Sequence, residues 1–207
     1  PLSSVWSRLV AGLLLCLTFT SCVNLDPTED PTRYYILNAP GISPSGVVES
    51  PDETAVLHIE RVEIPPYLDD RRFLVRENDT EISYVEFARW GEPMVSGIAR
   101  AVATNLEAGL KPAGVSYYPW KMPTAGAYRA RLRILRFEAW PDGHVELEIS
   151  AELWAPGTEK VQLVKFVEEY NLPGKGVDVP DMVETMSAAL FQFSKRAGEV
   201  FSEHLRE

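Results

Sequence analysis

Histidine and cysteine build most nucleophilic and metal-dependent sites, and this chain of 207 residues holds few of them. The histidines are His58, His144 and His204, and the cysteines are Cys16 and Cys22. Their positions lack the short spacings that bring Cys and His ligands to one zinc ion. The sequence also contains no G-x-S-x-G, H-E-x-x-H or glycine-rich phosphate loop. A zinc site of the Cys/His type is therefore set aside, and catalysis has no recognisable motif.

The other charged clusters have simpler explanations than catalysis. Asp69 and Asp70 form a carboxylate pair, but arginines follow at positions 71 and 72, which favours salt bridges within a loop. His58 lies in a run that is apolar on both faces, as expected of a histidine in a core. His204 falls in the last turn of a predicted helix, where it complements the helix dipole. We therefore expect no enzymatic activity, no metal and no cofactor.

Arginines alternate with other residues from position 129 to 133, which is the spacing of a possible phosphate-binding track along a strand. Glutamates alternate in the same way between positions 146 and 152, and residues 141–143 (PDG) between the two runs fit a tight hairpin loop. Counting back from the loop, with one bulge near residue 134, gives two cross-strand pairs: Arg136 with Glu148 and Arg131 with Glu152. Cross-strand charge pairing with this glutamate row is therefore favoured over phosphate binding.

The overall charge argues against a nucleic-acid partner. There are 30 Asp and Glu against 20 Lys and Arg, a formal net charge of −10, and no basic block. Binding to a phosphate backbone needs concentrated positive charge. A content of 45% hydrophobic and 24% charged residues is ordinary for a globular protein, and the length suits one domain.

The first 21 residues have the pattern of a secretory signal peptide. Arg8 precedes an apolar run of 11 residues from Leu9 to Phe19. At about 1.5 Å per residue this run covers roughly half of the hydrocarbon core of a bilayer, so it is too short for a transmembrane helix. Residues 19–22 (FTSC) resemble a bacterial lipobox, in which the cysteine becomes the lipidated amino terminus. An ordinary secretory signal with an incidental cysteine is the alternative.

Cys22 is accordingly the predicted lipidation site, and residues 22–32 are the predicted lipidated terminus and flexible tether. The stretch 24–32 is polar, contains two prolines and shows no apolar periodicity. Two or more acyl chains would make the anchor effectively permanent. Val23 stands where lipoproteins retained in the inner membrane typically have Asp, so the lipobox resemblance implies the periplasmic face of an outer membrane.

Residues 33–207 are predicted to form a single α+β domain. The predicted strands cover 33–37, 55–64, 73–76, 81–87, two runs between 127 and 155, and 161–170; the predicted helices cover 92–110 and the segment from Asp178 onward. This order predicts a mixed, largely antiparallel sheet with two amphipathic helices, and not a doubly wound βαβ array.

Four segments carry a family resemblance. In chain order they are the lipobox at Cys22, residues 33–37 (RYYIL), residues 64–76 (IPPYLDDRRFLVR) and residues 87–93 (FARWGEP), the last leading into a helix. Together they resemble the auxiliary lipoproteins of transport systems built on MCE proteins, the PqiC-like family, over most of residues 33–205. The resemblance implies a non-catalytic outer-membrane lipoprotein that docks an inner-membrane-anchored MCE-domain protein. It also implies a contribution to lipid transport and envelope integrity, with a homo-oligomeric ring as one arrangement.

Two of these motifs predict an exposed partner-binding patch, and a purely structural role is an equal alternative. Trp90 could pack on the first turn of the following helix, and Tyr67 could close a strand. The predicted partner-binding residues are Pro66, Tyr67, Arg71, Arg72, Arg89 and Trp90. Residues 117–120 (YYPW) are hard to bury completely and form a second candidate patch. Two other functions stay open: an anchored binding module for peptidoglycan or envelope-assembly partners, and a hydrolase.

Overall fold

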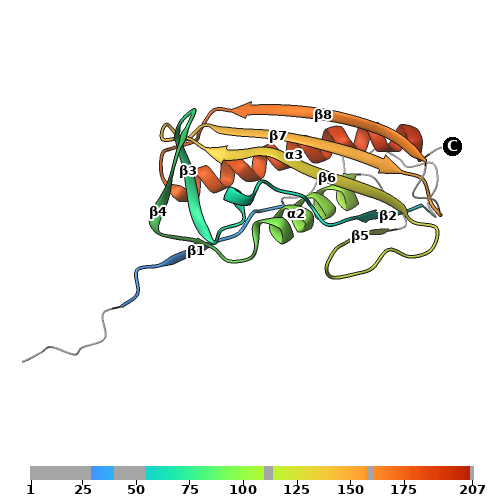
Figure 1. Cartoon of the computed structure of the whole chain (residues 1–207), viewed down its shortest axis with the longest axis horizontal. Helices are drawn as coiled ribbons and strands as arrows, with labels where there is room; N and C mark the ends of the chain where they lie inside the picture. Colours follow the sequence, from blue (N-terminus) through green and yellow to red (C-terminus); the bar gives the residue numbers. More distant parts are fainter. Residues whose placement is uncertain (1–28, 40–54, 110–113, 158–160, 206–207) are drawn as a thin grey trace, which may run out of the picture. The chain divides into compact units, whose positions relative to one another are not determined.

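A mixed β-sheet is the frame of the unit Thr32–Glu207, one of two units into which the chain divides (Figure 1). The computed structural model describes residues 29–39, 55–109, 114–157 and 161–205. The predicted signal peptide and Cys22 belong to the other unit, Pro1–Pro31, and lie outside the described residues. Within the described ranges the elements are β1 (Arg33–Tyr35), β2 (Val56–Ile59), the 3₁₀ helix η2 (Pro66–Leu68), β3 (Arg72–Asn78), β4 (Glu81–Trp90), α2 (Met94–Gly109), β5 (Gly114–Tyr117), β6 (Tyr128–Ala139), β7 (Val145–Trp154), β8 (Gln162–Leu172) and α3 (Val179–His204).

Strand β6 organises the sheet because it pairs with several neighbours along its length. It is antiparallel to β7, which is antiparallel to β8. The start of β6 runs parallel to β2, which continues to β5, and its last residue, Ala139, pairs with Val75 of β3. Beyond β3 the sheet continues through β4 to β1. The long pairings are antiparallel and the short ones parallel, which confirms the predicted α+β fold with a mixed sheet.

The register between β6 and β7 is the one predicted from the sequence. Arg131 pairs with Glu152 and Arg136 with Glu148, and the register shifts between Ile134 and Arg136. Gly143 in the connecting turn has φ of +84°, a conformation that favours glycine. Period-two alternation on both strands and a turn that requires glycine are together enough to fix a hairpin register.

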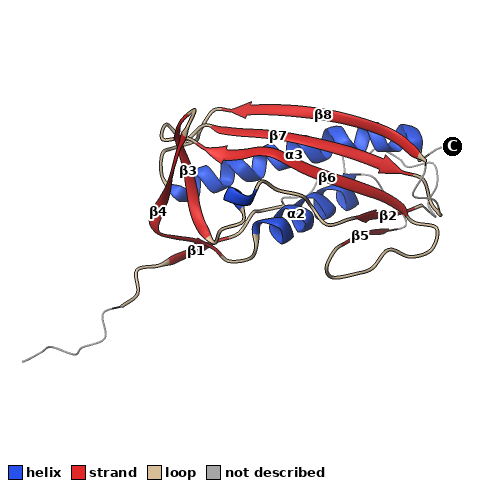
Figure 2. Ribbon diagram, viewed as in Figure 1, coloured by secondary structure: helices blue, strands red, loops and turns tan. Residues whose placement is uncertain are grey.

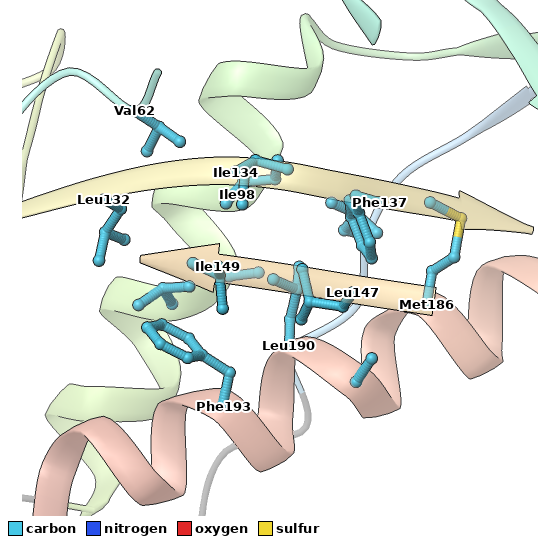
Figure 3. Packing of buried hydrophobic residues seen from close by; sticks show 14 of the residues in the cluster. Val62, Ile98, Leu132, Ile134, Phe137, Leu147, Ile149, Met186, Leu190 and Phe193 are labelled. Carbon is cyan, nitrogen blue, oxygen red and sulfur yellow. The ribbon is translucent and has the colours of Figure 1, made fainter. Parts of the chain in front are cut away.

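Both helices cover the same face of the sheet (Figure 2). Helix α2 begins after Pro93, whose carbonyl accepts the amide hydrogens of Ser96 and Gly97. Helix α3 begins after Asp178, and its first turn contains a proline and Asp181. Figure 3 shows the apolar stripes of the helices against the inward side chains of the sheet, labelled Val62, Ile98, Leu132, Ile134, Phe137, Leu147, Ile149, Met186, Leu190 and Phe193. Each such side chain contributes about 1.5–3 kcal/mol when fully buried. In the ranges described, no helix has the length and apolar character needed to cross a membrane.

Several strands differ in extent from the prediction; for example, β3 (Arg72–Asn78) and β4 (Glu81–Trp90) are longer than predicted. Strand β2 ends at Ile59 rather than at residue 64, because the chain then follows β6 through separate hydrogen bonds, from the Glu60 amide to Ala130 (2.9 Å) and from the Glu63 amide to Leu132 (3.0 Å). Strand β1 covers only the first part of the predicted strand 33–37. Strand β5 was not predicted, since its four residues carry too short an apolar pattern to be distinguished from a loop.

Candidate docking surface

The turn before β3 carries the first predicted docking residues. It is closed by a hydrogen bond from the Leu68 amide to the Pro65 carbonyl (3.0 Å), and the prolines of this segment favour the turn because their φ is already fixed. Leu68 is 4% exposed and holds the turn against the core, whereas Pro66 is exposed. The turn also brings Tyr67 to the end of β6.

Tyr67 and Arg76 bind a carboxylate that is fully buried. Glu138 of β6 is 0% exposed, and its Oε1 accepts hydrogen bonds from the Tyr67 hydroxyl (2.5 Å) and from Nη2 of Arg76 (2.6 Å). Nε of Arg76 donates to Oε2 of the same carboxylate. A charge removed from water needs such partners, because an unpaired buried charge costs several kcal/mol. We call Tyr67, Arg76 and Glu138 the buried cluster; it connects η2 and β3 to β6.

The environment keeps both donors of the buried cluster protonated. Burial, followed by the hydrogen bond to Glu138, raises the pKa of Tyr67 to about 12. The hydrogen bond to Glu138 also raises the pKa of Arg76 above its ordinary value. Neither donor titrates near neutral pH, so the cluster acts as a fixed ion pair and not as a proton-transfer pair.

Trp90 lies in the core, which corrects the prediction that its side chain is part of an exposed patch. It is 3% exposed, and its ring packs against Phe73 with the centroids 5.3 Å apart. The cause is the alternation of β4, in which Ala88 and Trp90 both point to the core. The intervening residue, Arg89, therefore points to the opposite face.

Arg89 stands in the middle of a row that crosses three strands. It pairs in register with Arg72 of β3 on one side and with Tyr34 of β1 on the other. Register partners share a face of the sheet, so these side chains gather on the face away from the core. Arg71 is exposed beside the row, and its carbonyl accepts the Trp90 amide (2.6 Å). We call Tyr34, Arg72 and Arg89, together with the exposed Arg71 next to Arg72 in the sequence, the arginine face.

Asp70 offsets part of the positive charge on the arginine face. Its carboxylate accepts two hydrogen bonds from the Arg72 side chain, from Nε (3.0 Å) and Nη2 (2.7 Å). These bonds are the main reason that the pKa of Asp70 is lowered to about 2. The Arg72 guanidinium also lies over the Tyr84 ring, 3.8 Å from its centroid. Nη1 of Arg89 donates to the backbone carbonyls of Ala88 (2.9 Å) and Val85 (3.3 Å).

The arginines of β6 interact with acids on both sides of the strand, in the segment after β2 and in the predicted glutamate row of β7. The ion pairs of these arginines are Arg129 with Glu60 (3.6 Å), Arg131 with Glu60 (2.5 Å), Arg133 with Glu63 (2.6 Å) and Arg136 with Glu146 (2.7 Å). Glu152 of β7 also pairs with Lys165 of β8 (2.8 Å). The segment after β2 lies beside β6 on the side opposite β7, and this position brings Glu60 and Glu63 into contact with Arg131 and Arg133. The hollow of about 190 Å³ between these groups is lined by both signs of charge, which disfavours a phosphate track.

Each histidine has a structural role. His58 is 2% exposed, its Nδ1 lies 2.9 Å from the buried Ser116 hydroxyl across the β2–β5 pair, and burial lowers its pKa. His144 lies 2.5 Å from Asp142 within the β6–β7 turn, and Nδ1 of His204 lies 3.0 Å from the Val200 carbonyl at the end of α3. Among the residues whose positions are described, no three His, Cys, Asp or Glu side chains are grouped to hold a metal ion.

A comparison with protein-family models identifies the chain. The model for the ABC-type transport auxiliary lipoprotein component matches residues 35–197. The chain belongs to this family. The match includes every predicted docking residue, whereas Cys22 lies before it. As an ABC-type transport auxiliary lipoprotein component, the protein is part of a transport system with other proteins, and the word lipoprotein indicates a membrane-anchored place in the cell envelope.

Solved structures support the fold of this auxiliary lipoprotein. A crystal structure of an uncharacterized protein has a TM-score of 0.66 and 16% identity, covering 82% of this chain and 98% of its own. A crystal structure of a Xanthomonas campestris protein with the family model DUF330 also has a TM-score of 0.66 and 16% identity, covering 83% and 97%. No curated protein matches the sequence.

The sequence analysis did not identify Glu138, which binds Tyr67 and Arg76 of the motif at residues 64–76. Glu138 looks like another charge on an alternating strand, and its partners Tyr67 and Arg76 lie 71 and 62 residues earlier. The available signal was a lone acid between Phe137 and Ala139 at the end of an arginine-rich strand. The second candidate patch divides: Tyr117 belongs to β5 and is half-buried, whereas Trp120 is 74% exposed.

Proposed function

We propose that this protein is a non-catalytic outer-membrane lipoprotein, anchored through lipidated Cys22, that docks an inner-membrane-anchored MCE-domain protein of an ABC-type lipid transport system. Its role there would be to support lipid movement between the membranes and the integrity of the envelope. The observation that carries the proposal is the family match over residues 35–197, which includes both motifs of the predicted patch.

The arginine face is the surface that we propose for docking. Tyr34, Arg72 and Arg89 are held by backbone pairing across β1, β4 and β3, so they are positioned before a partner arrives. Arg71 and Arg72 are exposed on a protein whose formal net charge is −10, so the face differs in charge from the rest of the chain. An acidic surface on the partner would complement it, and such charge pairs mainly raise the association rate and the specificity.

Affinity capture from detergent-solubilised membranes tests the partner. We expect an MCE-domain protein to be recovered with the full chain, and cell-wall fragments without it would favour the peptidoglycan-binding alternative. Arg71→Glu combined with Arg89→Glu should reduce the recovery at least tenfold. Lys195→Glu is the matched control, because Lys195 is exposed on α3, away from the arginine face. Equal recovery with both variants would place the docking surface elsewhere.

The anchor is tested separately by mass spectrometry of the mature amino terminus. Cys22→Ala should abolish acylation and leave the chain uncleaved or released from the membrane. An unmodified Cys22 in the membrane-extracted protein would contradict the lipoprotein proposal. The mass of the native assembly, measured with and without the partner, would show whether a homo-oligomer forms.

A further inference from the structure

The segment between β5 and β6 exposes large apolar side chains. Tyr118 is 41% exposed, Trp120 is 74% exposed and Met122 is 70% exposed. In Figure 1 this segment forms a long loop that stands away from the sheet. We call residues 118–122 (YPWKM) the aromatic loop. Side chains of this size that cluster in water usually mark a binding surface.

The aromatic loop has a defined shape at its base. The Lys121 amide donates to the Tyr117 carbonyl (3.1 Å), which closes a turn at the end of β5. Tyr118 and Pro119 line a hollow of about 240 Å³ together with Val62 and residues at the start of α2. Tyr118 and Pro119 are therefore supported by other segments of the domain, whereas Trp120, Lys121 and Met122, which we call the tip of the loop, are exposed to solvent. A supported loop loses little conformational entropy when its tip binds.

The stretch of sequence that contains the aromatic loop has no acidic residue. Between Glu107 and Glu138 there is no Asp or Glu, although the chain carries 30 acids and a formal net charge of −10. The arginines of this stretch lie on β6, where glutamates of neighbouring segments pair with them. Lys121 is exposed at the tip of the loop, between Trp120 and Met122. The tip thus presents one positive charge flanked by two apolar side chains, with no acid of its own.

This combination matches the interfacial layer of an anionic bilayer. Trp and Tyr are favoured at that depth because one end of the ring is apolar and the other is polar. A lysine near an anionic surface is attracted to the lipid phosphates, and its stem can remain among apolar groups while its ammonium reaches them.

We propose that the aromatic loop is a second membrane contact, in which Trp120 and Met122 enter the interface and Lys121 binds lipid phosphate. The occupant is the bilayer that carries the anchor, so the location rests on the proposed function. Only 12 positions separate Cys22 from Tyr34 in β1, and a chain of that length spans at most about 40 Å when fully extended. The domain therefore stays close to the membrane, and a weak second contact is enough to orient it.

Vesicle flotation of the mature chain from residue 22 onward, carrying Cys22→Ala and lacking the apolar leader, tests the loop without the anchor. On vesicles of phosphatidylethanolamine and phosphatidylglycerol, Trp120→Ala should weaken binding at least fivefold. Lys121→Gln should weaken it about fivefold on these vesicles and have little effect on phosphatidylcholine vesicles, since one charge near an anionic surface is lost. Val167→Ser is the matched control, because Val167 is 54% exposed on β8; it should leave binding unchanged.

Three results would overturn the proposal. The first is flotation of Trp120→Ala equal to that of its parent, and the second is an equal loss of vesicle binding with Val167→Ser. The third is that Trp120→Ala no longer captures the MCE-domain partner when no vesicles are present. The last result would identify the loop as a protein-docking site. Unfolding midpoints measured in parallel should be unchanged, because Trp120 is 74% exposed. If the loop binds vesicles but no MCE protein is captured by the full chain, the docking function fails and the membrane contact stands.

Discussion

Removing Arg76 should destabilise the domain far more than removing any arginine at the surface. Arg76→Leu leaves the Glu138 carboxylate, which is 0% exposed, with the Tyr67 hydroxyl as its remaining partner in the buried cluster. Breaking a buried pair from one side typically costs about 3–5 kcal/mol. A domain of ordinary stability has about 5–15 kcal/mol in total, so the variant should lose a large part of it.

The same geometry predicts that a second substitution restores stability. Replacing both members with leucine (Arg76→Leu with Glu138→Leu) removes the unpaired charge, and apolar replacements of buried ion pairs are often close to neutral. The double variant should therefore be more stable than Arg76→Leu alone. Tyr67→Phe should cost about 1.5–3 kcal/mol, the value for a hydrogen bond to a charged group.

Denaturant unfolding followed by tryptophan fluorescence measures these differences, and Arg133→Leu is the control. The Arg133 and Glu63 side chains are 60% and 63% exposed, so this ion pair should contribute at most about 1 kcal/mol. If Arg76→Leu costs no more than Arg133→Leu, or if the effects of Arg76→Leu and Glu138→Leu simply add, the buried cluster is not an interdependent unit.

Three further predictions concern the turns and the surface charges. Gly143→Ala should be much more destabilising than Gly157→Ala in the same unfolding assay. Both glycines have positive φ, but only at Gly143 would the new Cβ collide with a backbone carbonyl, that of Gly176 in the segment between β8 and α3. The folded-state pKa of Asp70 is lowered from 3.8 to about 2, so the contribution of Asp70 to the free energy of unfolding is complete above pH 3.8 and is lost as the pH falls to about 2. The stability difference between wild type and Asp70→Asn should therefore shrink over that range. A double-mutant cycle between Arg136 and Glu146 should give a coupling of about 0.2–1 kcal/mol, and a coupling near zero would show that the pair does not form in solution.

Local pattern was sufficient to predict the β6–β7 hairpin and the helices. Both strands alternate apart from the one predicted bulge in β6, the turn contains Gly143 in a conformation that favours glycine, and the N-cap of α3 is the predicted residue Asp178. Each of these features depends on residues within a few positions of one another. For that reason a single sequence is enough to predict these elements.

Partners from distant segments could not be predicted in this way. Alternation shows which side chains share a face, but not which segment lies on the other side of the strand. The sequence therefore does not predict that Glu60 and Glu63 pair with Arg131 and Arg133. The burial of Trp90 and the exposure of Trp120 likewise depend on contacts with distant segments, which local pattern does not predict. Both tryptophans lie close to a proline in the sequence. Trp90 is buried because β4 packs against the core, whereas Trp120 lies in a loop and is exposed.

The motif at residues 64–76 serves two purposes that the structure separates. Tyr67, Phe73 and Arg76 contact other parts of the chain, so changes at these positions act on folding before they act on any partner. Arg71 is exposed, and its backbone carbonyl, which accepts the Trp90 amide, is kept by any substitution of the side chain. A charge change at Arg71 can therefore alter docking while stability stays constant. The combination of an unchanged unfolding midpoint and a lost partner is the result that a purely structural motif cannot produce.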